Sequence, residues 1–214
     1  IALGNIKAGL VVSCETARQI VESTIEEINT HKNIEFYKEA VATLTGGSGA
    51  VAVLLTDGTL GHPDTQRHSL KGGVVKNAVS QHRLCSWGFE EKGMPTQSKV
   101  IMRTHAQGVL DNGLVLAQKT FESFRREFNL TSEQPDKFIG HQVGSLHHQK
   151  FYEALNVDMA KDFSTFPFLG NTGTVALPIT AAIADERGFL QPDDFVAFIG
   201  VGSGLNCAIL GVQW

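Results

Sequence analysis

The chain has 214 residues, of which 42% are hydrophobic and 19% charged, and its formal net charge is −4. A chain of this length can bury a sizeable core, as one large domain or two small ones. Its Lys and Arg residues are scattered and form no basic stripe, which argues against nucleic acid as a partner. No apolar run reaches the about 20 residues of a membrane-spanning helix, and no signal-peptide pattern opens the chain. We therefore expect no membrane span.

The cysteines and histidines offer no metal site. Cys14, Cys85 and Cys207 are odd in number and far apart, which argues against a disulfide framework and fits a reducing cytoplasm. His147 and His148 follow His141 without the HExxH spacing of a zinc protease. We expect both to be solvent-facing helix residues, and we expect neither metal nor cofactor.

The first quarter of the chain predicts strands around a polar helical stretch. Residues 1–7 resemble the end of a helix, residues 8–14 form an apolar strand, and residues 16–38 include a short helix. A Gly-rich turn at residues 46–49 precedes a strand of small and β-branched residues. Such a turn favours close backbone approach, and without GK[ST] or a following helix it is no phosphate loop. Packing is the favoured role of this turn.

The middle of the chain is less regular. Residues 60–64 predict a loop, and residues 68–81 a solvent-touched strand that opens a second half-domain. Residues 82–96 predict a long irregular loop, which could flank a binding pocket or serve packing alone. Residues 102–128 have the apolar spacing of a long amphipathic helix, although glycines at 108 and 113 could interrupt its first half.

The last third of the chain alternates predicted strands and helices, which indicates an α/β protein with helices layered on a mostly parallel or mixed sheet. The expected strands are residues 136–140, 163–166, 194–200 and 206–212, and the expected helices are residues 145–155 and 174–187.

The turn Gly170-Asn171-Thr172-Gly173 opens the second of these helices, and it supports two interpretations. Asn171 could cap the helix by accepting hydrogen bonds from its first N–H groups. Alternatively, Asn171 could lie beside His141, which ends the apolar strand at residues 136–140. Two such side chains can each donate a hydrogen bond to one carbonyl oxygen, an arrangement that stabilises an enolate or oxyanion.

Three motifs carry a family resemblance: HQVG at 141–144, LGNTG at 169–173 and GVGSGLNCAILGVQW at 200–214. They resemble the thiolase-superfamily condensing enzymes of the β-ketoacyl-acyl-carrier-protein synthase III type, and most closely the OleA-like acyl-CoA condensing branch. The resemblance implies a thiolase-like layered αβαβα fold made of two similar halves. Residues 1–60 would end the N-terminal half, including a capping loop, and residues 61–214 would form the C-terminal half.

The resemblance also implies an activity and site residues. The activity is an acyltransferase reaction, the Claisen condensation of two acyl thioesters to a β-ketoacyl product in fatty-acid or long-chain hydrocarbon or ketone biosynthesis. His141 and Asn171 would belong to a Cys-His-Asn triad. The backbone N–H of Ser203, where the family usually has Gly, would serve a second oxyanion hole, although a plain β-turn would also explain Gly202-Ser203-Gly204.

The reactive Cys of the triad should lie upstream of Ile1, on an N-terminal segment or a separate subunit. Cys14 is a poor substitute, because the neighbouring charge of Glu15 makes its thiolate scarcer. We expect Cys14, Cys85 and Cys207 to be small, buried or half-buried residues instead.

The sequence departs from the family's motifs at two positions, and one alternative function stays open. Gly144 replaces the Asn of the family's HQAN motif, which puts dependence on acyl-carrier protein in doubt and favours acyl-CoA substrates. Ser48 replaces an acidic residue of a GDGAG segment. The family is mostly homodimeric, and the strand at residues 49–55 would pair across the two-fold axis. The alternative is a non-catalytic thioester-binding subunit that has kept the fold and lost the nucleophile.

Overall fold

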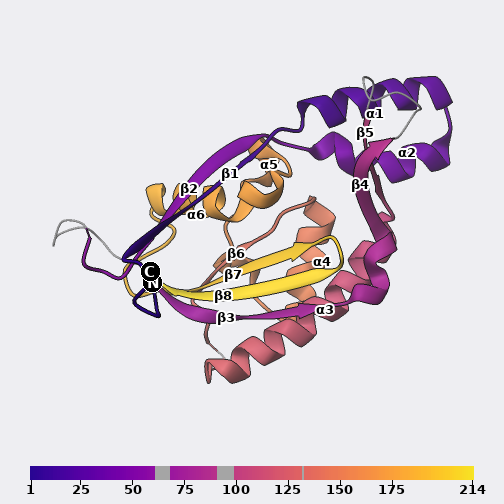
Figure 1. The fold of residues 1–214 in the computed structure, drawn as a ribbon. Coiled ribbons are helices and arrows are strands. Elements are labelled where there is room, and N and C mark those ends of the chain that lie inside the picture. The colour runs from indigo at the N-terminus through magenta and orange to yellow at the C-terminus, as the bar shows by residue number, and fades with distance from the viewer. Residues whose placement is uncertain (61–67, 91–98, 132) are drawn as a thin grey trace.

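The computed structural model describes residues 1–60, 68–90, 99–131 and 133–214, and it is an α/β structure (Figure 1). Short 3-10 turns occupy Val41–Thr45, Val79–Leu84, Met159–Lys161 and Gly173–Val175. The strands are β1 (Ala8–Glu15), β2 (Gly49–Thr56), β3 (Ser69–Asn77), β4 (Cys85–Glu90), β5 (Lys99–Thr104), β6 (Lys137–Gly140), β7 (Phe195–Gly202) and β8 (Asn206–Gln213). The helices are α1 (Arg18–His31), α2 (Ile34–Ala40), α3 (Ala106–Glu127), α4 (Ser145–Leu155), α5 (Phe166–Leu169) and α6 (Ala176–Glu186).

The elements stack in layers. A mixed sheet in the order β3-β8-β7-β6 has β6 parallel to β7 and its other pairs antiparallel. Helices α3 and α4 cover one face of this sheet, α6 lies against the other, and the antiparallel pair β1–β2 lies beyond α6 (Figure 1). Strand, helix, strand and helix layers therefore follow one another in the order of an αβαβα fold, which confirms the predicted class.

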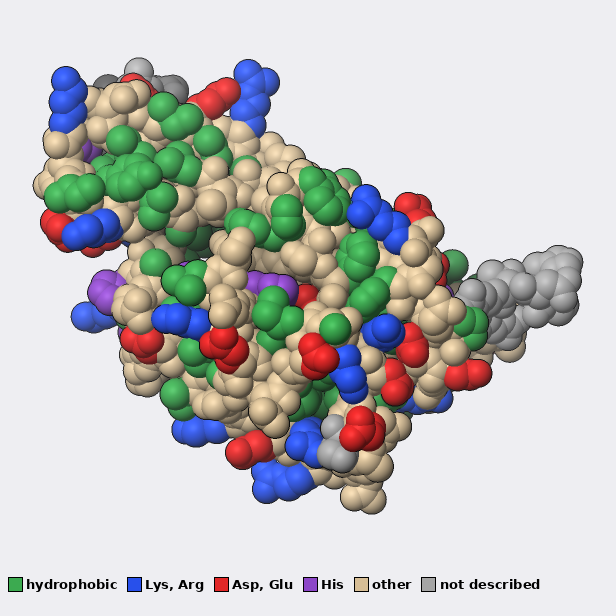
Figure 2. Space-filling model, turned by 180° about the vertical axis from the view of Figure 1, so that it is seen from behind, with side chains coloured by type: hydrophobic (Ala, Val, Ile, Leu, Met, Phe, Trp, Pro, Cys, Tyr) green, Lys and Arg blue, Asp and Glu red, His purple; other side chains and the backbone are tan. Residues whose placement is uncertain are grey.

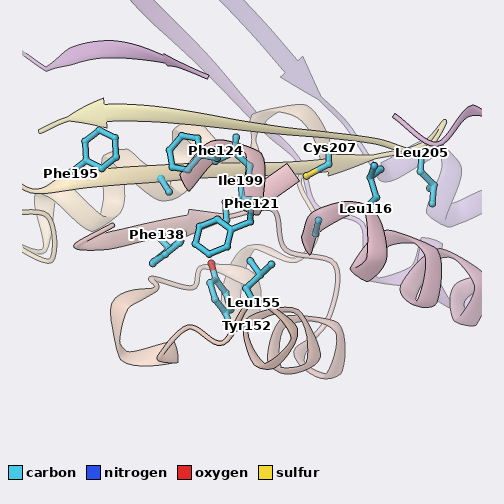
Figure 3. Packing of buried hydrophobic residues seen from close by; sticks show 13 residues of the cluster. Leu116, Phe121, Phe124, Phe138, Tyr152, Leu155, Phe195, Ile199, Leu205 and Cys207 are labelled. Atoms are coloured by element: carbon cyan, nitrogen blue, oxygen red, sulfur yellow. The ribbon is translucent and has the colours of Figure 1, made fainter. Parts of the chain in front are cut away.

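Strands β6 and β7 are buried on both faces, and the side chains of successive strand residues point to opposite faces. On β6, Phe138 packs toward α3 and α4 while Ile139 packs toward α6, and both are at most 1% exposed. The larger cluster, with Phe124, Tyr152 and Phe195, fills the space between the sheet and α3 and α4 (Figure 3). Burying each such aromatic side chain stabilises the fold by about 1.5–3 kcal/mol.

A lobe made of α1, α2 and the antiparallel β4–β5 hairpin extends beyond the layers (Figure 1). The Arg103 guanidinium on β5 lies 3.1 Å from the Glu27 carboxylate on α1 and 4.8 Å from the ring centroid of Phe36 on α2. Figure 2 shows hydrophobic side chains gathered on this lobe. Because α1 packs on β5, the segments 1–60 and 61–214 are in contact. Their division into two halves stays a prediction.

Most predicted elements are confirmed. The strands at residues 8–14, 49–55, 136–140, 194–200 and 206–212 are β1, β2, β6, β7 and β8, and the helix at residues 145–155 is α4. The predicted helix within residues 16–38 is longer than expected and forms α1. The glycines at 108 and 113 do not interrupt α3, since the His105 Nδ1 accepts a hydrogen bond from the Gly108 N–H at 3.0 Å and caps its first turn.

Two predictions near the N-terminus and in the middle of the chain are wrong. Residues 1–7 form turns and bends rather than the end of a helix, and Gly4 has a φ of 74°, which interrupts helical backbone. Residues 85–90 are not irregular, because β4 pairs antiparallel with the next strand, β5, from Cys85 opposite Thr104 to Glu90 opposite Lys99. The predicted loop at residues 61–64 and the end of the irregular stretch, residues 91–96, lie outside the described residues.

The strand predicted at residues 163–166 is also wrong. Its backbone groups are satisfied by one side chain instead of a neighbouring strand: the Gln142 Oε1 accepts from the N–H groups of Thr165 and Phe166, and the Gln142 Nε2 donates to the Phe163 carbonyl. The short helix α5 then begins at Phe166, with Pro167 in its first turn, where a proline is tolerated because no helical N–H bond is needed. Within the described part of the chain, no helix has the length and apolar character to cross a membrane.

Candidate active site

A cavity of about 200 Å³ opens between the mixed sheet, α3, α4 and the lobe. His141, Asn171 and Ser203 all line it, so the three residues singled out from the sequence border one space. Their roles in a reaction stay a prediction. The rest of the wall is mainly apolar, and includes Met102, Val109, Leu110, Leu114, Val143, Phe151, Ile199, Val201 and Leu205.

His141 follows directly after β6 at the carboxyl end of the strand. Its N–H donates to the Ile199 carbonyl on β7 at 2.8 Å, which continues the parallel pairing by one residue and fixes the backbone where the side chain enters the cavity. Burial lowers the pKa of His141 below its ordinary value, because the charged imidazolium loses its hydration. The imidazole is therefore neutral at pH 7 and carries one ring N–H that can donate.

Asn171 is held by its backbone and by its own side chain. Its N–H donates to the Thr45 carbonyl at 2.8 Å, and its carbonyl accepts from the Gly47 N–H at 2.7 Å. Its Oδ1 accepts from the Gly173 N–H at 3.0 Å. With the oxygen occupied in this way, the amide NH₂ is the part of the side chain left to donate.

The capping interpretation of Asn171 is thus correct in part. Its side chain accepts from the first residue of the 3-10 turn Gly173–Val175, but the residue at the cap position is Thr172, which makes no capping bond. Capping and donation are compatible, because they use opposite ends of one amide.

The Gly-rich turn predicted for close backbone approach has that role. A Cβ added at Gly47 would overlap the Leu169 carbonyl oxygen and would also meet the Thr172 side chain at 2.8 Å. Only glycine therefore lets the segment before β2 approach the Asn171 loop closely enough for the two backbone hydrogen bonds. Ser48 accepts a hydrogen bond from the Ala17 N–H at 3.1 Å, so it ties the turn to the start of α1.

Ser203 lies in the turn between β7 and β8. Its hydroxyl donates to the Cys85 Sγ at 3.2 Å, and the Cys85 Sγ lies 3.5 Å from the Thr104 Oγ1. These three side chains join the turn to the β4–β5 hairpin, and all three line the cavity. The Ser203 hydroxyl, which a glycine at this position would lack, thus links the two walls of the cavity.

Gln142 supports the site from behind the cavity wall, and sequence reasoning did not single it out. Its side chain is 3% exposed, and in addition to the backbone of residues 163–166 it receives a hydrogen bond from the Ser164 hydroxyl at 3.1 Å. The neighbour of His141 thereby holds the segment that leads to Asn171. The sequence shows only a glutamine next to His141; the burial that makes its amide need several partners comes from the fold.

The predicted exposure of His148 is wrong. Its side chain is 17% exposed and its Nε2 lies 2.6 Å from the Oδ2 of Asp162, whose side chain is fully buried. His147 is half-buried and also lines the cavity, and burial lowers its pKa. Among the described residues, no three or more His, Cys, Asp or Glu side chains are grouped to hold a metal ion.

The cysteines differ from one another. Cys207 is buried in the core as predicted, and burial raises its pKa to about 11. Cys85 is half-buried in the cavity wall. Cys14 is exposed, contrary to the expectation, because β1 has only β2 as a neighbour among the described strands.

The Gly47 contact predicts a loss of stability. Gly47→Ala should lower the free energy of unfolding of the complete protein by about 1–3 kcal/mol, the range for overpacking. Gly88→Ala is the matched control, because an added Cβ there meets nothing within 4 Å. Chemical denaturation of both variants measures the difference. Equal stability of the two variants would show that the Asn171 loop does not need this close approach.

The lowered pKa of His141 predicts a pH dependence. A folded-state pKa below the unfolded value of about 6.5 stabilises the fold above that pH, and this stabilisation is lost as the pH falls through the folded pKa. His141→Asn should therefore weaken the fall in unfolding free energy between about pH 7 and pH 5. Denaturation curves of wild type and variant across this range test it. An unchanged slope in the variant would contradict a buried, neutral His141.

Comparisons with known proteins agree with this geometry. Residues 126–214 match the family model for the C-terminal part of 3-oxoacyl-[acyl-carrier-protein] synthase III. Over 214 residues the chain is 48% identical to the acyl-CoA:acyl-CoA alkyltransferase of Shewanella oneidensis, covering 100% of this chain and 61% of that protein. It is 28% identical over 178 residues to β-ketoacyl-[acyl-carrier-protein] synthase III of Trichormus variabilis, covering 78% of this chain and 51% of that protein.

Solved structures give the same result. Xanthomonas campestris OleA superposes with a TM-score of 0.87 at 33% identity, covering 99% of this chain and 58% of that one. FabH of Xanthomonas oryzae superposes with a TM-score of 0.85 at 33% identity, covering 99% and 59%. The chain thus spans about three-fifths of the length of these proteins. In sequence and fold it matches the C-terminal part of the thiolase-superfamily condensing enzymes of the FabH and OleA kind.

Proposed function

We propose that the complete protein is an acyltransferase that condenses two acyl thioesters to a β-ketoacyl product. The observation that carries this proposal is the pair of donors in one cavity: His141 is neutral, and the Asn171 amide has its oxygen occupied by the Gly173 N–H. A thioester enolate is an oxyanion that such a pair stabilises. The kinship with FabH and OleA supports the same chemistry.

The reaction has two halves. In the first, a Cys upstream of Ile1 attacks an acyl thioester, the carrier thiol leaves, and the acyl group becomes bound to the enzyme. In the second, another acyl thioester gives its α-proton to a general base, or loses its β-carboxylate as CO₂, and becomes an enolate whose oxygen accepts hydrogen bonds from His141 and Asn171. The enolate carbon then attacks the enzyme-bound carbonyl, and the Cys leaves as a thiolate.

The two halves use different donors. Attack on the carbonyl at the Cys produces a tetrahedral oxyanion, for which the Ser203 backbone N–H is the proposed donor from this chain. His141 and Asn171 act on the second thioester. Because the serine contributes through its backbone, its hydroxyl remains free for the bond to Cys85.

Acyl-CoA is the proposed substrate class. Gly144 stands where the synthase III family has an Asn, and the relatives that match the full length of this chain at 34–48% identity are named acyl-CoA:acyl-CoA alkyltransferases. A structure of Xanthomonas campestris OleA was determined with bound lauric acid and lauroyl-CoA. The mainly apolar wall of the cavity suits an alkyl chain. The proposed product route is therefore long-chain hydrocarbon or ketone synthesis, with fatty-acid synthesis as the other family route.

The proposed assembly is a homodimer in the cytoplasm that includes the segment with the nucleophile. Apolar side chains on β1 and β2 are 37–66% exposed, namely Leu10, Val11, Val12, Val53, Leu54 and Leu55. In the described residues these two strands pair only with each other. Apolar strands of this kind are normally covered by further chain or by a second subunit.

Separating the two half-reactions tests the proposed roles. In the complete protein, His141→Ala and Asn171→Ala should each lower the condensation rate by about 10²–10³-fold, the cost of a lost oxyanion donor. Both variants should still be acylated upstream, because that step uses the Ser203 backbone. Mass spectrometry after incubation with an acyl-CoA measures acylation, and product formation measures condensation.

Cys14→Ala is the control, because Cys14 is not among the residues that line the cavity. It should be acylated and condense like the wild type. An acyl adduct on Cys14, or an adduct that is lost in the Asn171 variant, would contradict the assignment. If the complete protein forms no adduct at all, the non-catalytic thioester-binding subunit is the better description.

Light scattering tests the proposed homodimer. At micromolar concentration the complete protein should have twice the mass of one chain, because an apolar β1–β2 layer is costly to leave in water. Val53→Lys, which places a charge on this exposed surface, should shift the protein toward monomer. A stable monomer of the unaltered protein would refute the proposal.

A further inference from the structure

A buried carboxylate lies behind the cavity wall, and the proposed reaction does not use it. The side chain of Asp162 is fully buried. Its Oδ2 lies 2.6 Å from the His148 Nε2, and its Oδ1 accepts from the Tyr152 hydroxyl at 2.5 Å. Burial raises the pKa of Asp162, while the hydrogen bonds from His148, Tyr152 and the Gly140 N–H act in the opposite direction. A carboxylate this deep is costly unless such donors surround it.

The two side-chain donors lie one turn apart on one face of α4. Residues four apart on a helix are neighbours, so a single carboxylate that binds both sets the rotation of the helix as well as its distance. Both His148 and Tyr152 line the cavity, whereas Asp162 is not among its lining residues. Asp162 therefore acts on the cavity only through the helix and through β6.

The same carboxylate also reaches the strand that precedes His141. A Cβ added at Gly140 would come 2.7 Å from the Tyr152 hydroxyl oxygen and 3.8 Å from the Asp162 Oδ1. Asp162 also forms an isolated parallel β-bridge with Phe138 on the same strand. The His141 segment is consequently held on both sides, at Gly140 before it and at His148 after it.

On the other side of Asp162, the chain leads to Asn171. The four residues after Asp162 are fixed by the Gln142 side chain, and α5 then carries the chain to the Asn171 loop. Asp162 and Gln142 thus hold the segment around His141 in contact with the segment that leads to Asn171. They join the two stretches of chain whose side chains must meet at one oxygen atom.

We propose that Asp162, with His148 as its partner, is a positioning residue that sets His141 relative to Asn171 for the condensation step. This inference rests on the proposed function. His148 and Asp162 do not exchange groups with the substrate; they determine how closely the two donors approach the enolate oxygen. Misplacement of reacting groups by a change away from the chemistry can cost about 10²-fold in rate.

The test compares His148→Leu with His148→Gln in the complete protein. Leucine removes the donor, whereas the glutamine amide can still donate to Asp162. His148→Leu should lower condensation by about 10–10²-fold, with upstream acylation close to that of the wild type, and His148→Gln should restore most of the lost rate. A condensation rate per folded molecule in His148→Leu equal to that of the wild type would overturn the proposal, as would equal losses in both half-reactions.

Further variants keep the result interpretable. Asp162→Asn should reproduce the selective loss of condensation. Tyr152→Phe, which keeps the ring and removes one donor, serves if the Asn variant fails to fold. Gln149→Ala is the matched control, because it removes an exposed hydrogen bond on the same helix, from the Gln149 Nε2 to the Glu153 Oε1 at 2.7 Å. It should leave both half-reactions unchanged, and circular dichroism would give the folded fraction of each variant.

Failure of this inference and failure of the proposed function give different results. If His141→Ala and Asn171→Ala abolish condensation while the His148 variants do not, only the positioning role is wrong. If His141→Ala and Asn171→Ala also leave condensation intact, the proposed function itself is wrong.

Discussion

The site depends on a backbone contact between two layers of the fold. Asn171 is at the start of the chain segment that enters α6, and Gly46–Gly47 precedes β2 in the layer beyond that helix. The pairing of Asn171 with Gly47 and Thr45, at 2.7 and 2.8 Å, fixes a donor of the cavity against a different layer from the one that carries His141. Without this contact the amide would depend on a glycine-flanked loop alone, and such loops lose more conformational entropy on ordering. Stability and site geometry are therefore linked through Gly47.

The mixed sheet provides the second fixed frame. Strands β6 and β7 are covered on both faces, so they cannot shift without exposing aromatic side chains such as Phe138 and Phe195. His141 and Ser203 follow these two strands at neighbouring carboxyl ends. Polar groups at strand ends can face a cavity without breaking the ladder, because the backbone pairing has already finished. An apolar core thus holds polar donors at its border.

Sequence reasoning worked where pattern and turn chemistry act locally. The apolar periodicity of β6, α4 and β7 placed these elements almost to the residue, and the Gly-rich turn indicated close approach before any contact was known. It failed where distant residues decide the outcome. Residues 163–166 have β-like side chains, but Gln142 satisfies their backbone groups. Likewise His148 has the spacing of a helix-surface residue, and only the fold brings Asp162 to it.

The charges around the cavity suit the anion that the proposed reaction forms. Any nearby unpaired negative charge destabilises an enolate by electrostatic repulsion, and this repulsion is strong where water is excluded. Asp162 is a carboxylate behind the wall, yet its two oxygens are occupied by His148 and Tyr152. The partial positive charges of these donors lie between the carboxylate and the cavity, and they offset its negative charge there. Meanwhile burial keeps His141 neutral, so the cavity gains a donor without an additional charge that would need its own partner. Asp162 can therefore fix the position of the cavity wall without destabilising the enolate that the proposed reaction forms in the cavity.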